Sequence, residues 1–210
     1  MNNNFFYLTR QSSKSGTKSP LILLLHGFGS NEQDLFSFAE YLNKNATVVS
    51  LRAPITLFPN SYAWYNIYYN GSVKSYDIPA AKEVRDKLIK EIDFLVEKYN
   101  CDSKRITLIG FSQGAILGHS INQNSNGKIK NLIALSGYVD KDLVNLNQNN
   151  TSIYISHGID DDVIPFKESV ETNNLLKENN IEFQFESFKQ GHGVSQENLK
   201  SFLKWLEDKY

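Results

Sequence analysis

The chain has 210 residues, of which 40% are hydrophobic and 12% aromatic, enough to bury the core of one compact domain. Its 22 basic and 23 acidic residues give a formal net charge of −1, so no strong field would attract nucleic acid, and we expect no nucleic-acid partner. The single cysteine, Cys101, can form neither an internal disulfide nor a multi-thiolate zinc site, which fits a reducing compartment such as the cytoplasm.

Short apolar segments alternate along the chain with longer segments of helical period. This alternation predicts an α/β fold in which a mainly parallel sheet carries helices on both faces. Residues 21–25 and 106–110 are nearly unbroken apolar runs, as expected of central strands that are buried on both faces. Strands are expected at residues 21–25, 47–51, 106–111, 132–135, 152–156 and 183–188, with a weaker pattern at 5–9.

Segments of helical period predict helices at residues 32–42, 79–99, 114–121, 166–178 and 196–209. In the longest of them, Asp77 precedes Pro79 and is suited to cap the first turn. The same helix has an apolar stripe that indicates packing against the core, formed by Val84, Leu88, Ile92, Leu95 and Val96. Because the longest apolar run has only five residues, 21–25, we expect no signal peptide and no integral membrane contact.

One segment, residues 52–76, breaks the regular alternation. It contains Pro54, Pro59, Trp64 and five tyrosines but has no clear period. A connection of this length inside a compact domain is usually functional or disordered, and its aromatic content argues against disorder. We therefore predict one domain over residues 1–210, without a large cap, that carries a long aromatic loop.

The strongest chemical signal is the sequence Gly-Phe-Ser-Gln-Gly at residues 110–114, which has the form G-x-S-x-G. It follows an apolar strand and precedes a helical segment, and in that context a nucleophilic serine lies on a sharp strand-to-helix turn. The two glycines would remove side chains that otherwise collide with the neighbouring strand and helix. Ser112 is therefore the candidate nucleophile.

A serine of this kind needs a general base, and in this fold the partners follow in the order serine, acid, histidine. After Ser112 and outside its helix, the chain has only His157 and His192. His192 comes after the last expected strand and lies between two glycines, which would give an imidazole room to reach the serine. His192 is therefore the candidate base.

The acid is expected on the loop that follows strand 152–156. Three adjacent residues there, Asp160, Asp161 and Asp162, are all candidates, and spacing does not choose among them. The acid accepts the imidazole N–H, sets the tautomer and stabilises the imidazolium that forms. The two remaining carboxylates are expected to cap the helix at 166–178 or to face water.

A tetrahedral intermediate also needs backbone N–H donors for its oxyanion. Such donors come from the residue after the nucleophile and from the loop after an early strand. The second loop is present as His-Gly-Phe-Gly at residues 26–29, so we assign the donors to the amides of Phe28 and Gln113. A phosphate-binding loop is disfavoured, because the sequence has neither G-x-G-x-x-G nor a following Gly-Lys-Ser/Thr there.

Taken together, four segments resemble the phospholipase/carboxylesterase family of α/β hydrolases, which includes the acyl-protein thioesterases. They are residues 26–35, 110–115, 157–165 and 191–192. The resemblance implies an α/β-hydrolase fold, and a serine esterase without cofactor or metal that acts on carboxylic esters, lysophospholipids or acyl thioesters. It also selects Asp161 as the acid. The sequence departs from the family pattern at Phe28, where leucine is more frequent, and at Asp162, where proline is frequent.

The sequence Tyr-Ala-Trp-Tyr at residues 62–65 resembles the aromatic stretch that lines the acyl pocket of this family. Trp64 and Tyr65 are therefore candidate substrate contacts, although packing of the aromatic loop onto the domain explains them equally well. Three other residues are expected to be structural. His26 would brace the oxyanion loop through a backbone hydrogen bond, His119 would be a satisfied helix residue, and Arg52 would hold a strand end.

The sequence leaves three functions open. The first is hydrolysis of short to medium acyl esters or lysophospholipids through an acyl-enzyme on Ser112, and the second is thioester hydrolysis by the same residues. The third is a non-catalytic binding module, which a lost Ser112, Asp161 or His192 would indicate. The expected partner is a small-molecule or lipid ester, and the sequence leaves the oligomeric state open, with a homodimer among the states that it allows.

Overall fold

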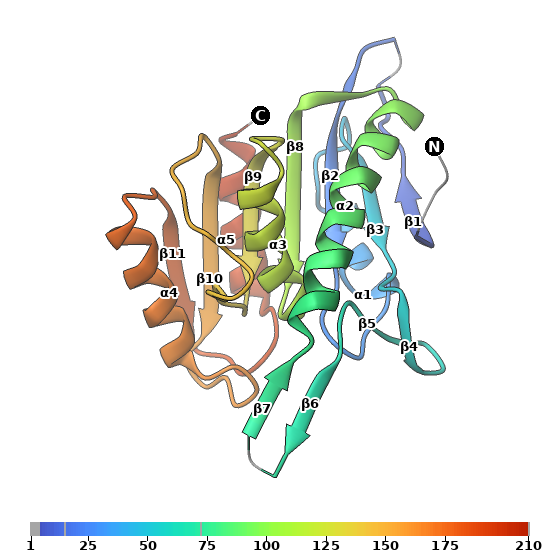
Figure 1. The fold of residues 1–210 in the computed structure, drawn as a ribbon. Coiled ribbons are helices and arrows are strands. Elements are labelled where there is room, and N and C mark those ends of the chain that lie inside the picture. Colours follow the sequence, from blue (N-terminus) through green and yellow to red (C-terminus); the bar gives the residue numbers. More distant parts are fainter. Residues whose placement is uncertain (1–4, 15, 72, 210) are drawn as a thin grey trace.

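The computed structural model describes residues 5–14, 16–71 and 73–209. A seven-stranded sheet forms its centre, in the order β1-β3-β2-β8-β9-β10-β11 (Figure 1). All neighbours pair in parallel except β1, which pairs antiparallel with β3. The strands are β1 (Tyr7–Arg10), β2 (Ser19–Leu25), β3 (Thr47–Leu51), β8 (Cys101–Phe111), β9 (Ile129–Leu135), β10 (Ser152–Gly158) and β11 (Gln184–Phe188). Every expected strand of the sheet is present, and the predicted α/β class is confirmed.

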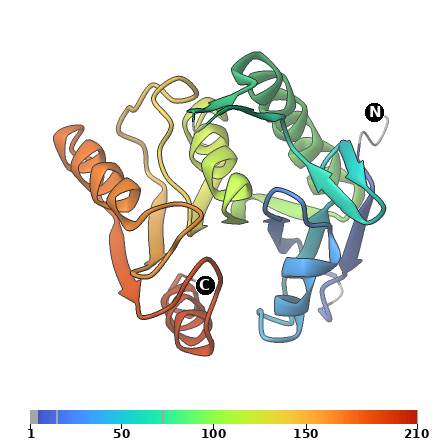
Figure 2. The same cartoon turned by 90° about the horizontal axis from the view of Figure 1, so that it is seen from below.

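Helices cover both faces of this sheet. Figure 2 shows them in a view that looks along the strands. One face carries α2 (Ile78–Lys98), α3 (Gln113–Asn124) and α4 (Phe166–Glu178), and the other carries α1 (Gln33–Phe36) and α5 (Gln196–Glu207). The two apolar layers are separate clusters, one on each face of the sheet. The apolar stripe of α2 is part of the larger cluster, and the predicted cap is confirmed, because the Asp77 carboxylate accepts the N–H of Ala80 at 3.1 Å.

The helix expected over residues 32–42 is broken into two shorter pieces. Helix α1 ends after one turn, and a 3₁₀ helix, η1 (Ser37–Glu40), follows. The Ser37 hydroxyl donates to the backbone carbonyl of Asp34 at 2.8 Å and so competes for an acceptor of the α-helical pattern. Short 3₁₀ turns are common at the ends of α-helices.

The aromatic loop is more regular than the sequence indicated. Residues 55–76 form two antiparallel hairpins, β4 (Ile55–Phe58) with β5 (Ser61–Ala63) and β6 (Ile67–Asn70) with β7 (Val73–Tyr76). Asn60 turns the first hairpin with a φ of 61°, and Gly71 lies in the turn of the second with a φ of 60°. These strands were missed because each has only three or four residues, too few for an alternating apolar pattern to be recognised in the sequence. Both hairpins lie beyond the carboxyl ends of the parallel strands (Figure 1).

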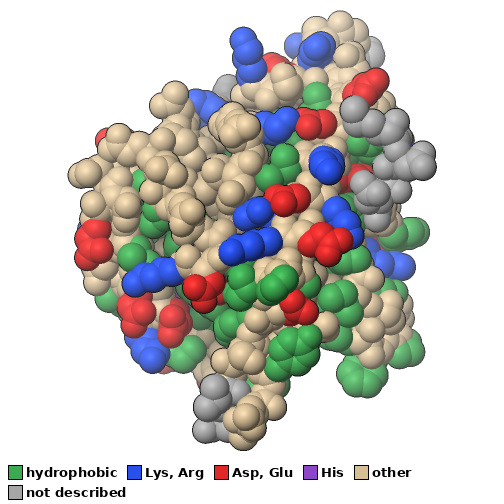
Figure 3. All heavy atoms as spheres, viewed as in Figure 1, with side chains coloured by type: hydrophobic (Ala, Val, Ile, Leu, Met, Phe, Trp, Pro, Cys, Tyr) green, Lys and Arg blue, Asp and Glu red, His purple; other side chains and the backbone are tan. Residues whose placement is uncertain are grey.

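Charged side chains of both signs are interspersed on the face that carries α2 (Figure 3), in keeping with the net charge of −1. No helix in the described part of the chain is long and apolar enough to cross a bilayer.

Candidate active site

Ser112 occupies a strained turn between β8 and α3. Its φ of 53° and ψ of −117° are unusual for a residue with a side chain, and a backbone of this kind costs about 1–3 kcal/mol. The turn is held by a hydrogen bond from the Ser112 N–H to the carbonyl of Leu135 at 2.9 Å. A sharp strand-to-helix turn that exposes a serine hydroxyl is expected to be strained in this way.

The glycines around Ser112 have the steric role that the motif predicted. A Cβ on Gly110 would overlap the carbonyl of Gly114 in the helix, and a Cβ on Gly114 would overlap the carbonyl of Leu25 in the neighbouring strand β2. Helix α3 can therefore approach the sheet closely only because both side chains are missing.

His192 joins Ser112 to Asp161. Its Nε2 lies 3.0 Å from the Ser112 Oγ, and its Nδ1 lies 2.7 Å from the Asp161 Oδ2. Because an ionised carboxylate only accepts, the proton of the neutral imidazole lies on Nδ1, and Nε2 is left to accept the hydroxyl proton of Ser112. The three predicted side chains, which are far apart in sequence, thus form one chain of hydrogen bonds.

The structure distinguishes Asp161 from its two neighbours. The Asp161 side chain is 0% exposed, and its Oδ1 accepts the backbone N–H groups of Val163 at 2.9 Å and Ile164 at 2.8 Å. Asp160 and Asp162 are exposed to solvent. Of the two alternatives expected for them, exposure to water is therefore the one observed, and neither caps the next helix, whose N-cap position is Pro165.

Sequence reasoning missed the role of His157 beside the acid. Its Nε2 lies 2.8 Å from the carbonyl oxygen of Ile164 and 3.3 Å from the Asp161 Oδ2. Since both partners are acceptors, Nε2 carries a proton and donates. The sequence contained one signal, the His-Gly-x-x-Asp spacing, but nothing in it placed the imidazole against the carboxylate.

The loop that carries His192 is held by Gln190. The Gln190 side chain donates to the carbonyl of Gly193 at 2.6 Å and accepts the N–H of Ser195 at 3.0 Å. The predicted need for glycines beside His192 is not supported, because a Cβ on Gly193 would meet nothing within 4 Å and one on Gly191 would only reach a carbonyl at 3.7 Å. The loop has room for side chains at both positions.

The two assigned oxyanion donors lie on segments that approach each other closely. Gln113 is the first residue of α3, so its N–H has no acceptor within the helix. Gly27 precedes Phe28, and a Cβ on it would lie 3.3 Å from the Ser112 Cβ, so the loop passes right beside the serine. Among the described residues, neither amide N–H has a hydrogen-bond partner.

Of the two remaining histidines, one behaves as predicted and the other does not. His26 braces the loop, because its Nδ1 donates to the carbonyl of Gly27 at 2.7 Å while its Nε2 accepts the N–H of Ala53 at 3.1 Å. Burial lowers the pKa of His26. His119 was expected to be satisfied, but its buried Nε2 has no partner within the described residues, and burial lowers its pKa to about 4.

Trp64 and Tyr65 both lie in the larger core cluster, and each is 1% exposed. This burial favours the interpretation that both residues pack the aromatic loop onto the domain. Direct contact of either residue with a substrate stays a prediction. Arg52 is structural as expected, since its guanidinium forms two hydrogen bonds of 2.6 Å with the Glu32 carboxylate and lies over the rings of Phe6 and Tyr62.

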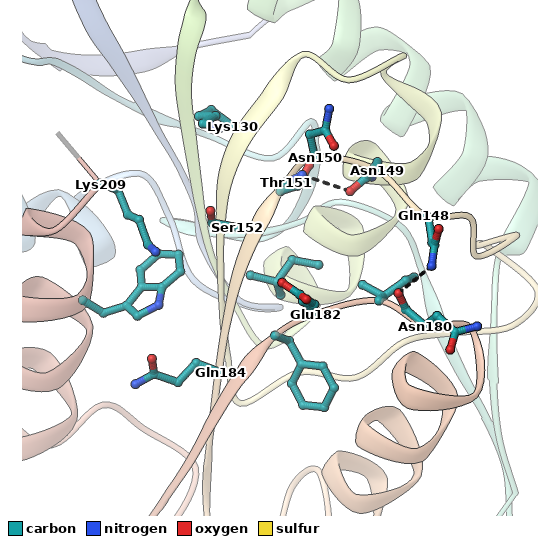
Figure 4. Close-up of a pocket in the computed structure, with 14 residues that line it drawn as sticks. Lys130, Gln148, Asn149, Asn150, Thr151, Ser152, Asn180, Glu182, Gln184 and Lys209 are labelled. Atoms are coloured by element: carbon teal, nitrogen blue, oxygen red, sulfur yellow. Dashed lines mark hydrogen bonds between the residues drawn. The ribbon is translucent and has the colours of Figure 1, made fainter.

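A separate polar cavity of about 940 Å³ lies at the opposite end of the sheet (Figure 4). Its lining includes Ser152 and Gln184, the first residues of β10 and β11, whereas Ser112 follows the carboxyl end of β8. Within residues 5–14, 16–71 and 73–209, no three histidine, cysteine or acidic side chains cluster in a way that could hold a metal ion.

Comparison with known proteins shows the family of the chain. A model of the phospholipase/carboxylesterase family matches residues 10–209. The chain belongs to this family. Acyl-protein thioesterase 1 from Kluyveromyces lactis is 27% identical to this family member, over 94% of the chain and 95% of the relative. Lysophospholipase-like protein 1 from Mus musculus is 23% identical, over 92% of the chain and 88% of the relative.

Solved structures show the same fold as this phospholipase/carboxylesterase family member. A Bacillus cereus carboxylesterase superposes with a TM-score of 0.86 at 23% identity, covering 100% of this chain and 96% of the other. Acyl-protein thioesterase 2 from Zea mays gives a TM-score of 0.74 at 19% identity, covering 97% of this chain and 98% of the other. The predicted α/β-hydrolase fold is thus confirmed. The predicted hydrolase class is confirmed by the family match and the relatives.

Proposed function

We propose that this chain is a serine esterase that hydrolyses carboxylic esters through an acyl-enzyme on Ser112. The observation that carries the proposal is the hydrogen-bonded chain from Ser112 through His192 to the buried Asp161. Membership of the phospholipase/carboxylesterase family supports the same bond class.

The geometry suggests how the two half-reactions would proceed. The Ser112 Oγ attacks the carbonyl carbon while its proton passes to the His192 Nε2, and Asp161 stabilises the resulting imidazolium. The amides of Phe28 and Gln113 donate to the oxyanion. Collapse breaks the bond to the alcohol, which leaves with the proton from His192. A water molecule then attacks the acyl-enzyme in the same way, which releases the acid and restores the Ser112 hydroxyl.

A second candidate is thioester hydrolysis. It is favoured by the 27% identity to a protein named acyl-protein thioesterase 1, over nearly the whole of both chains. The same residues would act, with a thiol in place of the alcohol as leaving group. A non-catalytic binding module is disfavoured, because Ser112, Asp161 and His192 are all present and in contact.

The proposed substrate is a small-molecule or monoacyl lipid ester, and the proposed location is the cytoplasm. The single cysteine, Cys101, is free and buried, which supports a reducing compartment. A homodimer stays a prediction, which sedimentation of the purified chain would test.

The test is a hydrolysis profile over nitrophenyl esters and acyl thioesters of increasing chain length, compared with Ser112→Ala. We expect the variant to lose turnover by orders of magnitude, because the nucleophile is gone. A fluorophosphonate probe should label the wild type and leave Ser112→Ala unlabelled. Equal turnover and equal labelling of the two proteins would refute the proposal, and the ratio of ester to thioester kcat/KM decides between the two leaving groups.

A further inference from the structure

We infer that Trp64 is a positioning residue that holds both oxyanion donors in place, rather than a residue that contacts the acyl group. The inference rests on the proposed function and extends it. Trp64 follows β5 in the first of the two hairpins beyond the sheet. It makes one hydrogen bond to each of the two segments that carry the donors.

The first bond fixes the early glycine loop. The indole Nε1–H of Trp64 donates to the carbonyl oxygen of His26 at 2.8 Å, and the rings of these two residues lie 5.3 Å apart. His26 is two residues before Phe28, whose amide is an assigned donor. Both bonding groups are buried, so the indole bond is shielded from competing water.

The second bond fixes the residue after the nucleophile. The backbone N–H of Trp64 donates to the side-chain Oε1 of Gln113 at 3.0 Å, and the Nε2 of the same amide donates to the carbonyl of Tyr65 at 2.8 Å. The Gln113 side chain is thus bonded at both ends to residues 64 and 65. Its backbone N–H is the other assigned donor.

The neighbouring strand strengthens this arrangement. Tyr62 in β5 accepts the N–H of Gly29 at 2.8 Å and donates its own N–H to the carbonyl of Ser30 at 2.8 Å. The glycine loop is therefore tied to the first hairpin on both sides of Phe28, by Trp64 before it and by Tyr62 after it.

Burial separates this role from substrate contact. Trp64 is 1% exposed and packs against Phe5 as well as His26, so an acyl chain at the surface of the site would not reach the indole in this structure. Oxyanion donors act only when they are held where the charge develops, and displacement by about 1 Å can cost about a hundredfold in rate. A buried residue bonded to both donor segments is suited to that task.

The test compares Trp64→Phe with Trp205→Phe, the same substitution at the other tryptophan of the chain. Trp205 lies in the apolar cluster on the opposite face of the sheet and packs against Tyr154. Both variants lose buried surface, but only Trp64→Phe loses the bond to His26. We expect Trp64→Phe to lower kcat and the rate of fluorophosphonate labelling by about ten- to a hundredfold, with KM little changed at every acyl length. Trp205→Phe should leave both rates near wild type.

A second variant covers the case in which Trp64→Phe does not fold. Replacement of Trp64 by benzothienylalanine removes the indole N–H but keeps the size and shape of the ring, and it should lower kcat in the same way. A KM change that grows with acyl length at unchanged kcat would instead identify Trp64 as a substrate contact and overturn the inference. Wild-type kcat in the benzothienylalanine variant would also overturn it. Failure of the proposed function would be seen separately, as absent turnover and labelling in the wild type.

Discussion

The Nε2 of His157 lies 3.3 Å from the Oδ2 of Asp161, the same carboxylate oxygen that accepts the N–H of His192. Both His157 and the acid have side chains that are fully buried. Two imidazoles thus meet one carboxylate, and His157 also bonds the carbonyl of Ile164 across the acid loop. We therefore expect His157 to help orient the oxygen on which the tautomer of His192 depends.

Replacement of His157 should therefore affect stability and catalysis together. His157→Phe removes the N–H and leaves buried acceptors without it, which should lower the free energy of unfolding in urea by about 1–3 kcal/mol. We also expect kcat per active site to fall, with the active sites counted by fluorophosphonate titration. His157→Gln retains an N–H donor at similar reach and should recover part of both losses. Equal kcat per titrated active site in wild type and both variants would show that His157 does not orient the acid.

The choice of Asp161 over its neighbours can be tested by matched amide substitutions. Asp161→Asn should lower kcat on the order of 10⁴-fold, because the amide can donate to His192 and favour the wrong tautomer. Asp160→Asn and Asp162→Asn remove exposed carboxylates and should leave kcat near the wild-type value. A large loss in either of these controls, with an active Asp161→Asn, would mean that a neighbour supplies the acid.

The close approach of α3 to the sheet predicts a strict size limit at Gly114. A Cβ there would overlap the carbonyl of Leu25, so Gly114→Ala should lower the free energy of unfolding by about 1–3 kcal/mol or more. Gly193→Ala is the control, since its Cβ would meet nothing within 4 Å. Urea unfolding monitored by tryptophan fluorescence measures both. Equal stability of the two variants would contradict the packing described around Ser112.

Buried His119 predicts a loss of stability in acid. Burial lowers its pKa to about 4 in the folded state, while the unfolded chain binds the proton near pH 6.5. Between these values the unfolded state holds more protons, so stability is complete above about pH 6.5 and falls as the pH drops toward 4. The loss should reach roughly 3 kcal/mol. Urea unfolding from pH 4.5 to 7 should give a flatter curve for His119→Leu, and parallel curves for the two proteins would disprove this role.

Much of the fold and of the site could be read from the sequence. Buried parallel strands have continuous apolar runs, so the central strands were found within a few residues, and Ser112 and His192 followed from a short motif and from chain order. The two hairpins at residues 55–76 were not found. The first of them is bonded to the glycine loop through the backbone of Tyr62, and tertiary bonds of this kind leave no period in the sequence.

The amino-acid sequence by itself indicated the α/β class, a candidate nucleophile, a candidate base and three candidate acids, because apolar periodicity and local motifs are properties of neighbouring residues. Only the tertiary structure showed that the His157 imidazole contacts the Asp161 carboxylate. It also showed that Trp64 bonds to both segments that carry the assigned oxyanion donors. Trp64 is distant in sequence from both segments that it contacts. His157 and Asp161 are only four residues apart, but their side chains meet only because the loop between them turns back. Hydrogen bonds depend on distance and angle in space, so such relationships exist only once the sheet, the loops and the hairpins are packed together.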